Sequence, residues 1–122
     1  MSAPLILVVD DDIWQAEQHQ RVLVAAGYET QYCNTPQAAI ELIDEKSPQA
    51  IILDLLLEGN TAFVLLHELQ SDAKLHNIPV IVCSNVADSI SLEQLKPYGA
   101  RRIIDKTTMH PQDIIAAIKA VL

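Results

Sequence analysis

Short runs of aliphatic residues alternate along the chain with longer segments in which apolar residues recur at helical spacing. Three of the short runs are almost continuously apolar, which is typical of strands buried on both faces of a parallel sheet. The segment 28–33 instead alternates polar and apolar residues, as a half-exposed edge strand does. In chain order, the predicted strands are residues 5–9, 28–33, 50–53, 78–83 and 102–104.

Helical segments are predicted after each of these strands. Thr35 and Pro36 form an N-cap followed by a first-turn proline, whereas Gly27 and Gly99 are typical helix stops. The predicted helices are residues 13–26, a segment beginning at residue 36, residues 62–70, a short helix from residue 91 that ends before Gly99, and residues 111–122. Strict alternation of strand and helix predicts an α/β fold, with a doubly wound, five-stranded parallel sheet and helices on both faces.

The length of 122 residues suits one domain, and the predicted elements fill it, so we expect a single domain over residues 1–122 with no output domain. The net charge of −8 disfavours binding to nucleic acid or to anionic membranes and suits cations. No apolar run is long enough to span a bilayer, and no signal peptide is recognisable. Two cysteines in such a chain predict reduced thiols and a cytoplasmic location.

Polar residues follow four of the five predicted strands. Because the carboxyl ends of parallel strands meet at one edge of the sheet, these side chains are expected to converge. They are Asp10, Asp11 and Asp12 after the first strand, Asp54 after the third, Ser84 after the fourth, and Asp105 and Lys106 after the fifth.

Such a cluster of carboxylates predicts a cation site. Two carboxylates ~5 Å apart repel each other by about 3 kcal/mol at an effective dielectric of 20, and a bound cation relieves this repulsion. Oxygen ligands without histidine or cysteine favour Mg²⁺. The charge of Lys106 and the hydroxyl of Ser84 suit the oxygens of a phosphoryl group, which one carboxylate would accept. Asp12 is expected to cap the first helix instead.

Four sequence runs carry a resemblance to a known family: LILVVDDD, AIILD, VIVCS and RIIDK. In this order and spacing they resemble the signature segments of a response-regulator receiver domain of two-component systems, and the resemblance covers essentially the whole chain. It implies a flavodoxin-like strand order 2-1-3-4-5. The residue roles that it implies are Asp54 as the phosphoacceptor, Asp11 directly on Mg²⁺, Asp10 acting through water, the backbone carbonyl of Leu56 as a further metal ligand, Ser84 as the switch hydroxyl, and Lys106 as the partner of the phosphoryl group.

The same resemblance implies a phosphoacceptor switch rather than an enzyme, one that assists its own phosphorylation and dephosphorylation. A sensor histidine kinase or a phosphotransfer protein would donate the phosphoryl group. The signal would then pass by protein–protein binding through the face around the fourth helix, fifth strand and fifth helix. No nucleic-acid or membrane partner is expected, and the chain is predicted to be a monomer or a weak dimer.

Five positions depart from the usual pattern of this family. Glu58 and Ala62 stand where the loop after the phosphoacceptor often has a proline and a glycine. Thr107 follows Lys106, where receivers usually have a proline after a cis peptide bond, and a cis bond without proline costs about 3 kcal/mol more than a trans one. Ile103 replaces the usual aromatic residue whose rotamer reports phosphorylation. Asn85 follows the switch hydroxyl, where a small residue is common. These changes affect the expected output relay more than the phosphorylation chemistry.

Two alternative functions remain open on the sequence. Asp10 and Asp12 also fit the DxD start of haloacid-dehalogenase-type phosphatases, as nucleophile and acid, with Ser84 and Lys106 as later motifs. However, no acidic pair follows the lysine, and the chain is short for a substrate cap. The other alternative is a degenerate receiver that acts as a docking module independently of phosphorylation.

Other residues with reactive side chains are given structural roles. Cys33 and Cys83 lie on strands that the implied order separates by two others, so we expect free, buried thiols. Trp14 is predicted to pack over the start of the first helix. The histidines lack metal-binding spacing and are expected at the surface or in helix caps; they are His19, His67, His76 and His110.

Overall fold

The computed structural model describes residues 3–54, 61–71, 77–84, 92–106 and 109–122. Five parallel strands form one sheet in the order β2-β1-β3-β4-β5, as the resemblance implied. The strands are β1 (Leu5–Val9), β2 (Glu29–Cys33), β3 (Ala50–Asp54), β4 (Val80–Ser84) and β5 (Ala100–Asp105). The helices are α1 (Ile13–Ala25), α2 (Pro36–Lys46), α3 (Thr61–Ser71), α4 (Leu92–Leu95), the short 3₁₀ helix η2 (Lys96–Tyr98) and α5 (Pro111–Val121).

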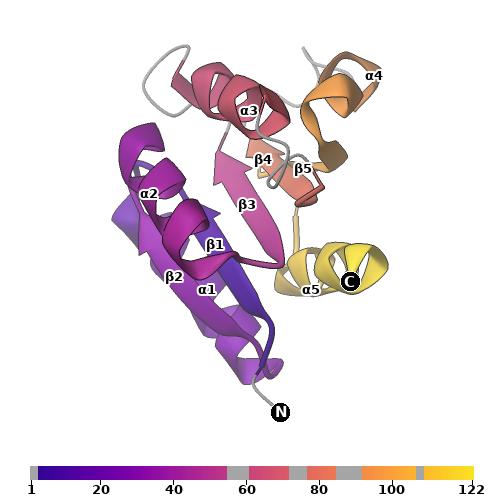
Figure 1. Ribbon diagram of the computed structural model, residues 1–122. Helices are drawn as coiled ribbons and strands as arrows, with labels where there is room; N and C mark the ends of the chain where they lie inside the picture. The colour runs from indigo at the N-terminus through magenta and orange to yellow at the C-terminus, as the bar shows by residue number, and fades with distance from the viewer. Residues whose placement is uncertain (1–2, 55–60, 72–76, 85–91, 107–108) are drawn as a thin grey trace.

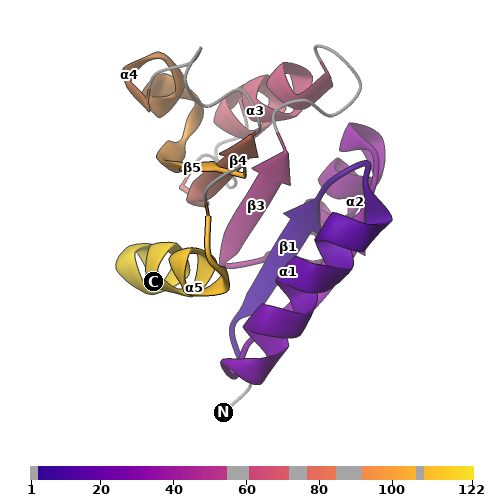
Figure 2. The same ribbon diagram turned by 180° about the vertical axis from the view of Figure 1, so that it is seen from behind.

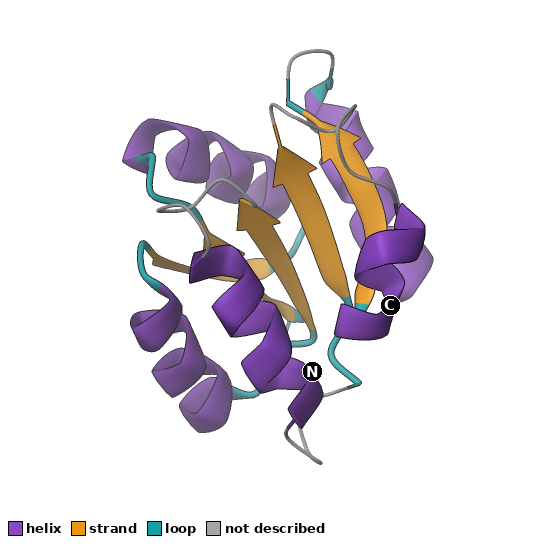
Figure 3. Cartoon of the chain, turned by 90° about the horizontal axis from the view of Figure 1, so that it is seen from above, coloured by secondary structure: helices purple, strands orange, loops and turns teal. Residues whose placement is uncertain are grey.

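The helices cover the two faces of the sheet in separate layers. Figures 1 and 2 show α1 and α5 on one side of the strands and α2 and α3 on the other. Figure 3, seen from above, shows the sheet between these layers. Parallel strands joined through helices require this arrangement, because each crossover must return across a face of the sheet. The predicted doubly wound α/β fold is therefore confirmed.

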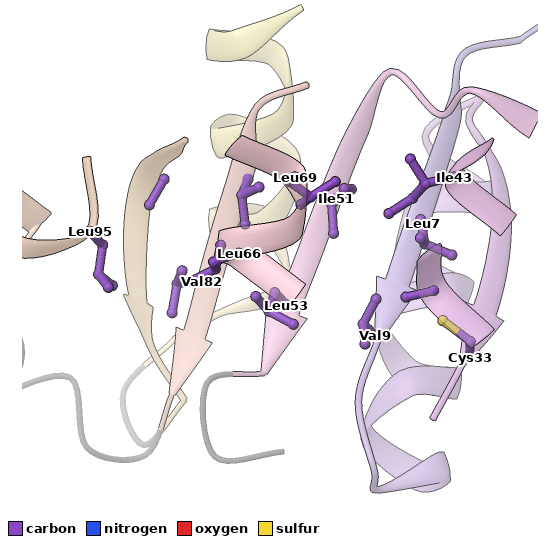
Figure 4. Close-up of a cluster of buried hydrophobic side chains, with 13 residues drawn as sticks. Leu7, Val9, Cys33, Ile43, Ile51, Leu53, Leu66, Leu69, Val82 and Leu95 are labelled. Atoms are coloured by element: carbon purple, nitrogen blue, oxygen red, sulfur yellow. The ribbon is translucent and has the colours of Figure 1, made fainter. Parts of the chain in front are cut away.

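Alternate residues of each central strand enter opposite cores. The core beneath α2 and α3 holds Leu7, Ile51 and Val82. Figure 4 shows Ile51 and Val82 close to Leu66 and Leu69 of α3, and Leu7 close to Ile43 of α2. The core beneath α1 and α5 is built on neighbouring strand residues such as Val8 and Ile52. All residues of β3 and β4 are buried, which explains their nearly continuous apolar sequence.

Helix ends follow the local signals in the sequence. Asp12 caps α1, and its carboxylate accepts hydrogen bonds from the backbone N–H groups of Trp14 and Gln15. The Thr35 hydroxyl accepts a bond from Ala38 N at the start of α2. Gly99, with φ of 91°, ends η2 in the left-handed region that glycine tolerates best. The predicted cap at residue 91 lies outside the described residues.

The structure moves some boundaries of the predicted strands. β4 begins two residues later than predicted, after Pro79, which has no N–H to donate. β5 is longer than predicted because it also includes Ala100 and the exposed Arg101 at its start and Asp105 at its end. A register shift between Val80 and Ile81 marks an irregularity in the pairing of β4 with β5. None of the helices in the described parts of the chain is long and apolar enough to cross a membrane.

Candidate functional site

Three carboxylates meet at the carboxyl edge of the sheet. β1 ends just before Asp10 and Asp11, and Asp54 is the last residue of the neighbouring strand β3. Each of the three offers an oxygen, and these oxygens all lie within 4.8 Å of one another. The structure thus brings together acids that are more than 40 residues apart in the chain, because parallel strands place their ends at one edge.

Asp10 is buried and held from several directions. Its Oδ1 accepts a hydrogen bond of 2.9 Å from Asp12 N, and its backbone carbonyl accepts one of 2.8 Å from the Tyr32 hydroxyl. Burial raises the pKa of Asp10 to about 6, although the Asp12 N–H and the Lys106 charge oppose the increase. The Asp54 carboxylate adds to the increase in pKa, as a like charge nearby must.

Lys106 neutralises part of this charge. Its Nζ lies 3.1 Å from Asp10 Oδ2 and 3.2 Å from Asp54 Oδ2, and its side chain is only 6% exposed. Burial alone would lower the pKa of Lys106, but the two carboxylates together raise it above its ordinary value. The lysine is therefore held as a buried cation between two acids from different strands.

The backbone aligns Lys106 with the neighbouring strand. Lys106 N donates a hydrogen bond of 3.0 Å to the carbonyl of Ser84, the fully buried last residue of β4. The sequence therefore places the lysine and the hydroxyl residue at adjoining strand ends, as expected from the polar residues that follow each apolar run. The positions of Leu56, Asn85 and Thr107 lie outside the described residues.

The donor set fits a hard divalent cation. Asp10 and Asp54 are buried while Asp11 is exposed, so the cluster is open to solvent at Asp11, where an ion could enter. Carboxylate oxygens, completed by water, are the ligands that Mg²⁺ prefers in proteins. Lys106 pairs with the two buried acids and compensates part of their charge.

Two polar residues of α1 that sequence reasoning missed lie beside this cluster. The Gln15 side-chain carbonyl accepts a hydrogen bond of 2.5 Å from Lys106 Nζ. His19, predicted to lie at the surface or in a cap, is instead 7% exposed, so this prediction was wrong. The two are four residues apart and therefore share one face of the helix with the buried Ala16 and Leu23. That spacing was the available signal, but polar residues on a helix usually indicate its solvent face.

The surroundings of His19 affect its charge. Its Nε2 is buried and lacks a hydrogen-bond partner within the described part of the chain. Burial lowers the pKa of His19 to about 4; the Lys106 charge lowers it further, whereas the Asp54 charge opposes the decrease. The imidazole is therefore neutral at pH 7.

Other predicted structural residues can be placed. Cys33 and Cys83 are free and buried, as expected, and burial raises the pKa of each thiol to about 12. Trp14 is 75% exposed, so the prediction that it packs over the start of α1 was wrong. His110 does start α5, where its N–H donates to the Asp113 carboxylate, while His67 is exposed on α3. His76 lies outside the described residues.

Comparisons with known proteins agree with this fold. The family model described as the response regulator receiver domain matches residues 6–119. The phosphate regulon transcriptional regulatory protein PhoB of Pseudomonas aeruginosa is 31% identical over 122 residues, covering 100% of this chain and 53% of that protein. The polar-differentiation response regulator DivK of Brucella ovis is 26% identical, covering 96% of this chain and 94% of that protein. The chemotaxis response regulator CheY4 of Vibrio cholerae has a TM-score of 0.88 at 20% identity, covering 99% of this chain and 100% of that chain.

The chain belongs to the response-regulator receiver family, because the family model spans nearly all of it. Receiver domains are phosphoacceptor switches of two-component signalling and not enzymes in the ordinary sense, and they interact with histidine kinases or phosphotransfer proteins. The haloacid-dehalogenase alternative is not favoured by these relatives. The chain spans about half the length of PhoB and of the other curated relatives that it matches first.

Proposed function

We propose that this chain is a magnesium-dependent phosphoacceptor that receives a phosphoryl group on Asp54. The donor would be the phosphohistidine of a sensor kinase or of a phosphotransfer protein. The observation that carries the proposal is the placement of the Asp54 carboxylate, which lies 3.2 Å from the Lys106 ammonium and beside two further acids. A carboxylate nucleophile next to a fixed cation suits phosphoryl transfer, where most of the catalysis is positioning and charge stabilisation.

The transfer can be written with its atoms balanced. An Asp54 carboxylate oxygen attacks the phosphorus, the new O–P bond forms, and the P–N bond to the donor imidazole breaks. The imidazole leaves and takes a proton. Lys106 supplies positive charge to the phosphoryl oxygens, and Ser84 supplies a hydroxyl. In dephosphorylation, water attacks the phosphorus, the Asp54 O–P bond breaks, and inorganic phosphate leaves while the Asp54 carboxylate is restored. The same groups assist this step.

A bound Mg²⁺ would supply charge neutralisation for the phosphoryl oxygens. Asp11 would contact it directly, Asp10 through water, and Asp54 through one carboxylate oxygen. These roles are those that the family resemblance implies, and the meeting of the three acids at one site supports them. The Leu56 carbonyl as a further ligand stays a prediction. The two free thiols, Cys33 and Cys83, support a cytoplasmic site of action, where cysteines are kept reduced.

The output would be a change in protein binding. Asp54 phosphorylation would draw Ser84 and Lys106 toward the phosphoryl group and bias the face formed by α4, β5 and α5. The Lys106 N–H···O=C Ser84 bond supports this proposal, since it ties the end of β5 to the end of β4. Ile103, half-buried in β5, would move in place of the usual aromatic side chain.

Incubation of the chain with acetyl phosphate and Mg²⁺ is expected to add the mass of one phosphoryl group, and Asp54→Asn is expected to abolish this addition. Intact-mass spectrometry measures both, with EDTA as the metal-free comparison. Asp12→Asn is the matched control, because Asp12 caps α1 and an asparagine can keep that cap.

Each outcome of this labelling decides between functions. Labelling that persists in Asp54→Asn contradicts the proposal. Labelling lost in Asp10→Asn but not in Asp54→Asn would favour the phosphatase alternative, in which Asp10 is the nucleophile. No labelling of the unaltered chain, together with partner binding that ignores phosphodonor, would identify a docking module that acts without phosphorylation.

Addition of Mg²⁺ is expected to raise the melting temperature of the unphosphorylated chain by several degrees. Only the folded state brings the three carboxylates together, and a ligand at 100 times its Kd stabilises a protein by about 3 kcal/mol. Thermal unfolding followed by circular dichroism measures the shift. Asp11→Asn removes an exposed ligand, and we expect it to abolish most of the increase; an equal increase in this variant would place Mg²⁺ elsewhere.

A further inference from the structure

Gln15 gives the Lys106 ammonium an uncharged partner. Lys106 Nζ lies 2.5 Å from Gln15 Oε1, closer than its distances of 3.1 and 3.2 Å to Asp10 Oδ2 and Asp54 Oδ2. A lysine ammonium has three N–H donors and no acceptor. The three oxygens therefore match its donors one to one, and the shortest of the three contacts comes from an amide on α1.

Hydrogen bonds fix both the backbone and the side-chain amide of Gln15. Its backbone N–H is bound at 3.4 Å by the Asp12 carboxylate in the first turn of α1. Its side chain reaches the end of β5 and lines a cavity of about 200 Å³ between α1 and α5, whose walls include Val22, Met109 and Ile114. Because there is space beside it, close packing does not explain where the amide lies. The bond to Lys106 does.

We propose that Gln15 is a positioning residue for phosphoryl transfer, which holds Lys106 at the site while Asp10 and Asp54 turn from the lysine toward a metal ion. This inference rests on the proposed function of Asp54. A divalent ion neutralises much of the negative charge of its carboxylate ligands. The ion pairs between those carboxylates and a neighbouring ammonium are then weaker. The Gln15 amide is uncharged and is not one of the carboxylates that would hold the ion, so its oxygen keeps Lys106 in place.

The chemical consequence concerns the donors of Lys106. When a phosphoryl group arrives on Asp54, its oxygens can take the two N–H donors that the carboxylates shared. The third N–H donor stays bonded to Gln15. The Lys106 side chain therefore does not swing out into solvent, and its ammonium is already in place to stabilise the charge of the transferred phosphoryl group. Such pre-positioning increases the rate of a reaction, because a charge that is already in place needs no reorganisation in the transition state.

Gln15→Met is expected to lower the initial rate of Asp54 labelling by acetyl phosphate and Mg²⁺ about tenfold, which corresponds to roughly 1.4 kcal/mol of activation free energy. Methionine has a similar length and flexibility but no comparable acceptor, and the adjoining cavity can accommodate it. Gln18→Met is the matched control, because Gln18 lines the same cavity from the same helix. It is expected to leave the rate unchanged.

A spectroscopic readout separates positioning from a general effect on the fold. In NMR spectra of the full chain, the Lys106 ammonium protons should be visible because hydrogen bonds slow their exchange with water; the signal is assigned by its absence from Lys106→Met. We expect the signal in the unaltered chain with and without Mg²⁺, and its loss from Gln15→Met when Mg²⁺ is added. Gln15→Glu keeps an oxygen at the same reach and is expected to restore it.

The combined outcomes are decisive. An unchanged signal or an unchanged labelling rate in Gln15→Met overturns the positioning role, and so does a slower rate in Gln18→Met of equal size. Failure of Gln15→Glu to restore the ammonium signal also counts against it. A chain that takes up no phosphoryl group contradicts the proposed function of Asp54, whereas the ammonium signal still reports whether Gln15 holds Lys106.

Discussion

Replacing Lys106 with methionine is expected to lower the free energy of unfolding of the metal-free protein by about 3 kcal/mol at pH 8. The Lys106 ammonium pairs with both buried carboxylates, Asp10 and Asp54, so its removal takes away positive charge that offsets their mutual repulsion. Urea denaturation measures the loss. It should shrink toward pH 5, because without the lysine charge the pKa of Asp10 rises further and protonation then relieves the repulsion.

A second substitution tests the cause of this loss. In Lys106→Met combined with Asp54→Asn, one of the two acids is gone, and most of the lost stability is expected to return. Lys119→Met, on the exposed side of α5, is the control for loss of a lysine and should change stability by less than about 0.5 kcal/mol. Strictly additive effects of the Lys106 and Asp54 substitutions would contradict the ion pair as the source of the loss.

His19→Leu is expected to change the dependence of stability on pH. Burial lowers the pKa of His19 to about 4 in the folded chain, whereas an unfolded histidine titrates near 6.5. Between these values the unfolded state binds a proton that the folded state does not, so His19 makes the protein less stable as the pH falls. Relative to His19→Leu, the unaltered protein should lose about 2 kcal/mol between pH 7 and pH 4.5.

The pH profile must be compared with that of the His19→Leu variant, because Asp10 changes the stability of the protein with pH in the opposite direction. Its pKa of about 6 lies above the unfolded value of 3.8, so the folded state takes up the proton first and gains stability as the pH falls through this range. Both proteins carry Asp10, and its contribution cancels in the difference. His67→Leu, at an exposed position on α3, is the control substitution. Parallel pH profiles for His19→Leu and the unaltered chain would contradict the buried, neutral imidazole.

The fold was largely predictable because the central strands are buried on both faces. β1 and β3 were predicted within one residue, since only aliphatic residues fit between two helical layers. β5 was predicted too short because Arg101 interrupts the apolar pattern at its start and Asp105 at its end, although an edge strand can expose polar residues. Sequence periodicity reports burial, and it fails where a strand is only partly covered.

Only part of the candidate site could be predicted from the sequence. Asp10, Asp54 and Lys106 could be found because a charge after an apolar run marks a strand end, and strand ends in a parallel sheet converge. Gln15 and His19 could not, because their contacts depend on how α1 is rotated against the sheet and α5. A polar residue on an amphipathic helix is ordinarily solvent-facing, and only the packed structure shows that these two face inward.

The two buried cysteines lie in different cores, one on each face of the sheet, so each thiol can report the opening of its own helical layer. Cys33 belongs to the core beneath α2 and α3, and Cys83 to the core beneath α1 and α5, directly before Ser84. With their thiol pKa values near 12, neither is reactive at neutral pH until its own layer opens. Native-state alkylation, resolved by peptide mass, therefore compares the opening of the two helical layers without any engineered probe, and repeating it on phosphodonor-treated protein compares how the modification changes each.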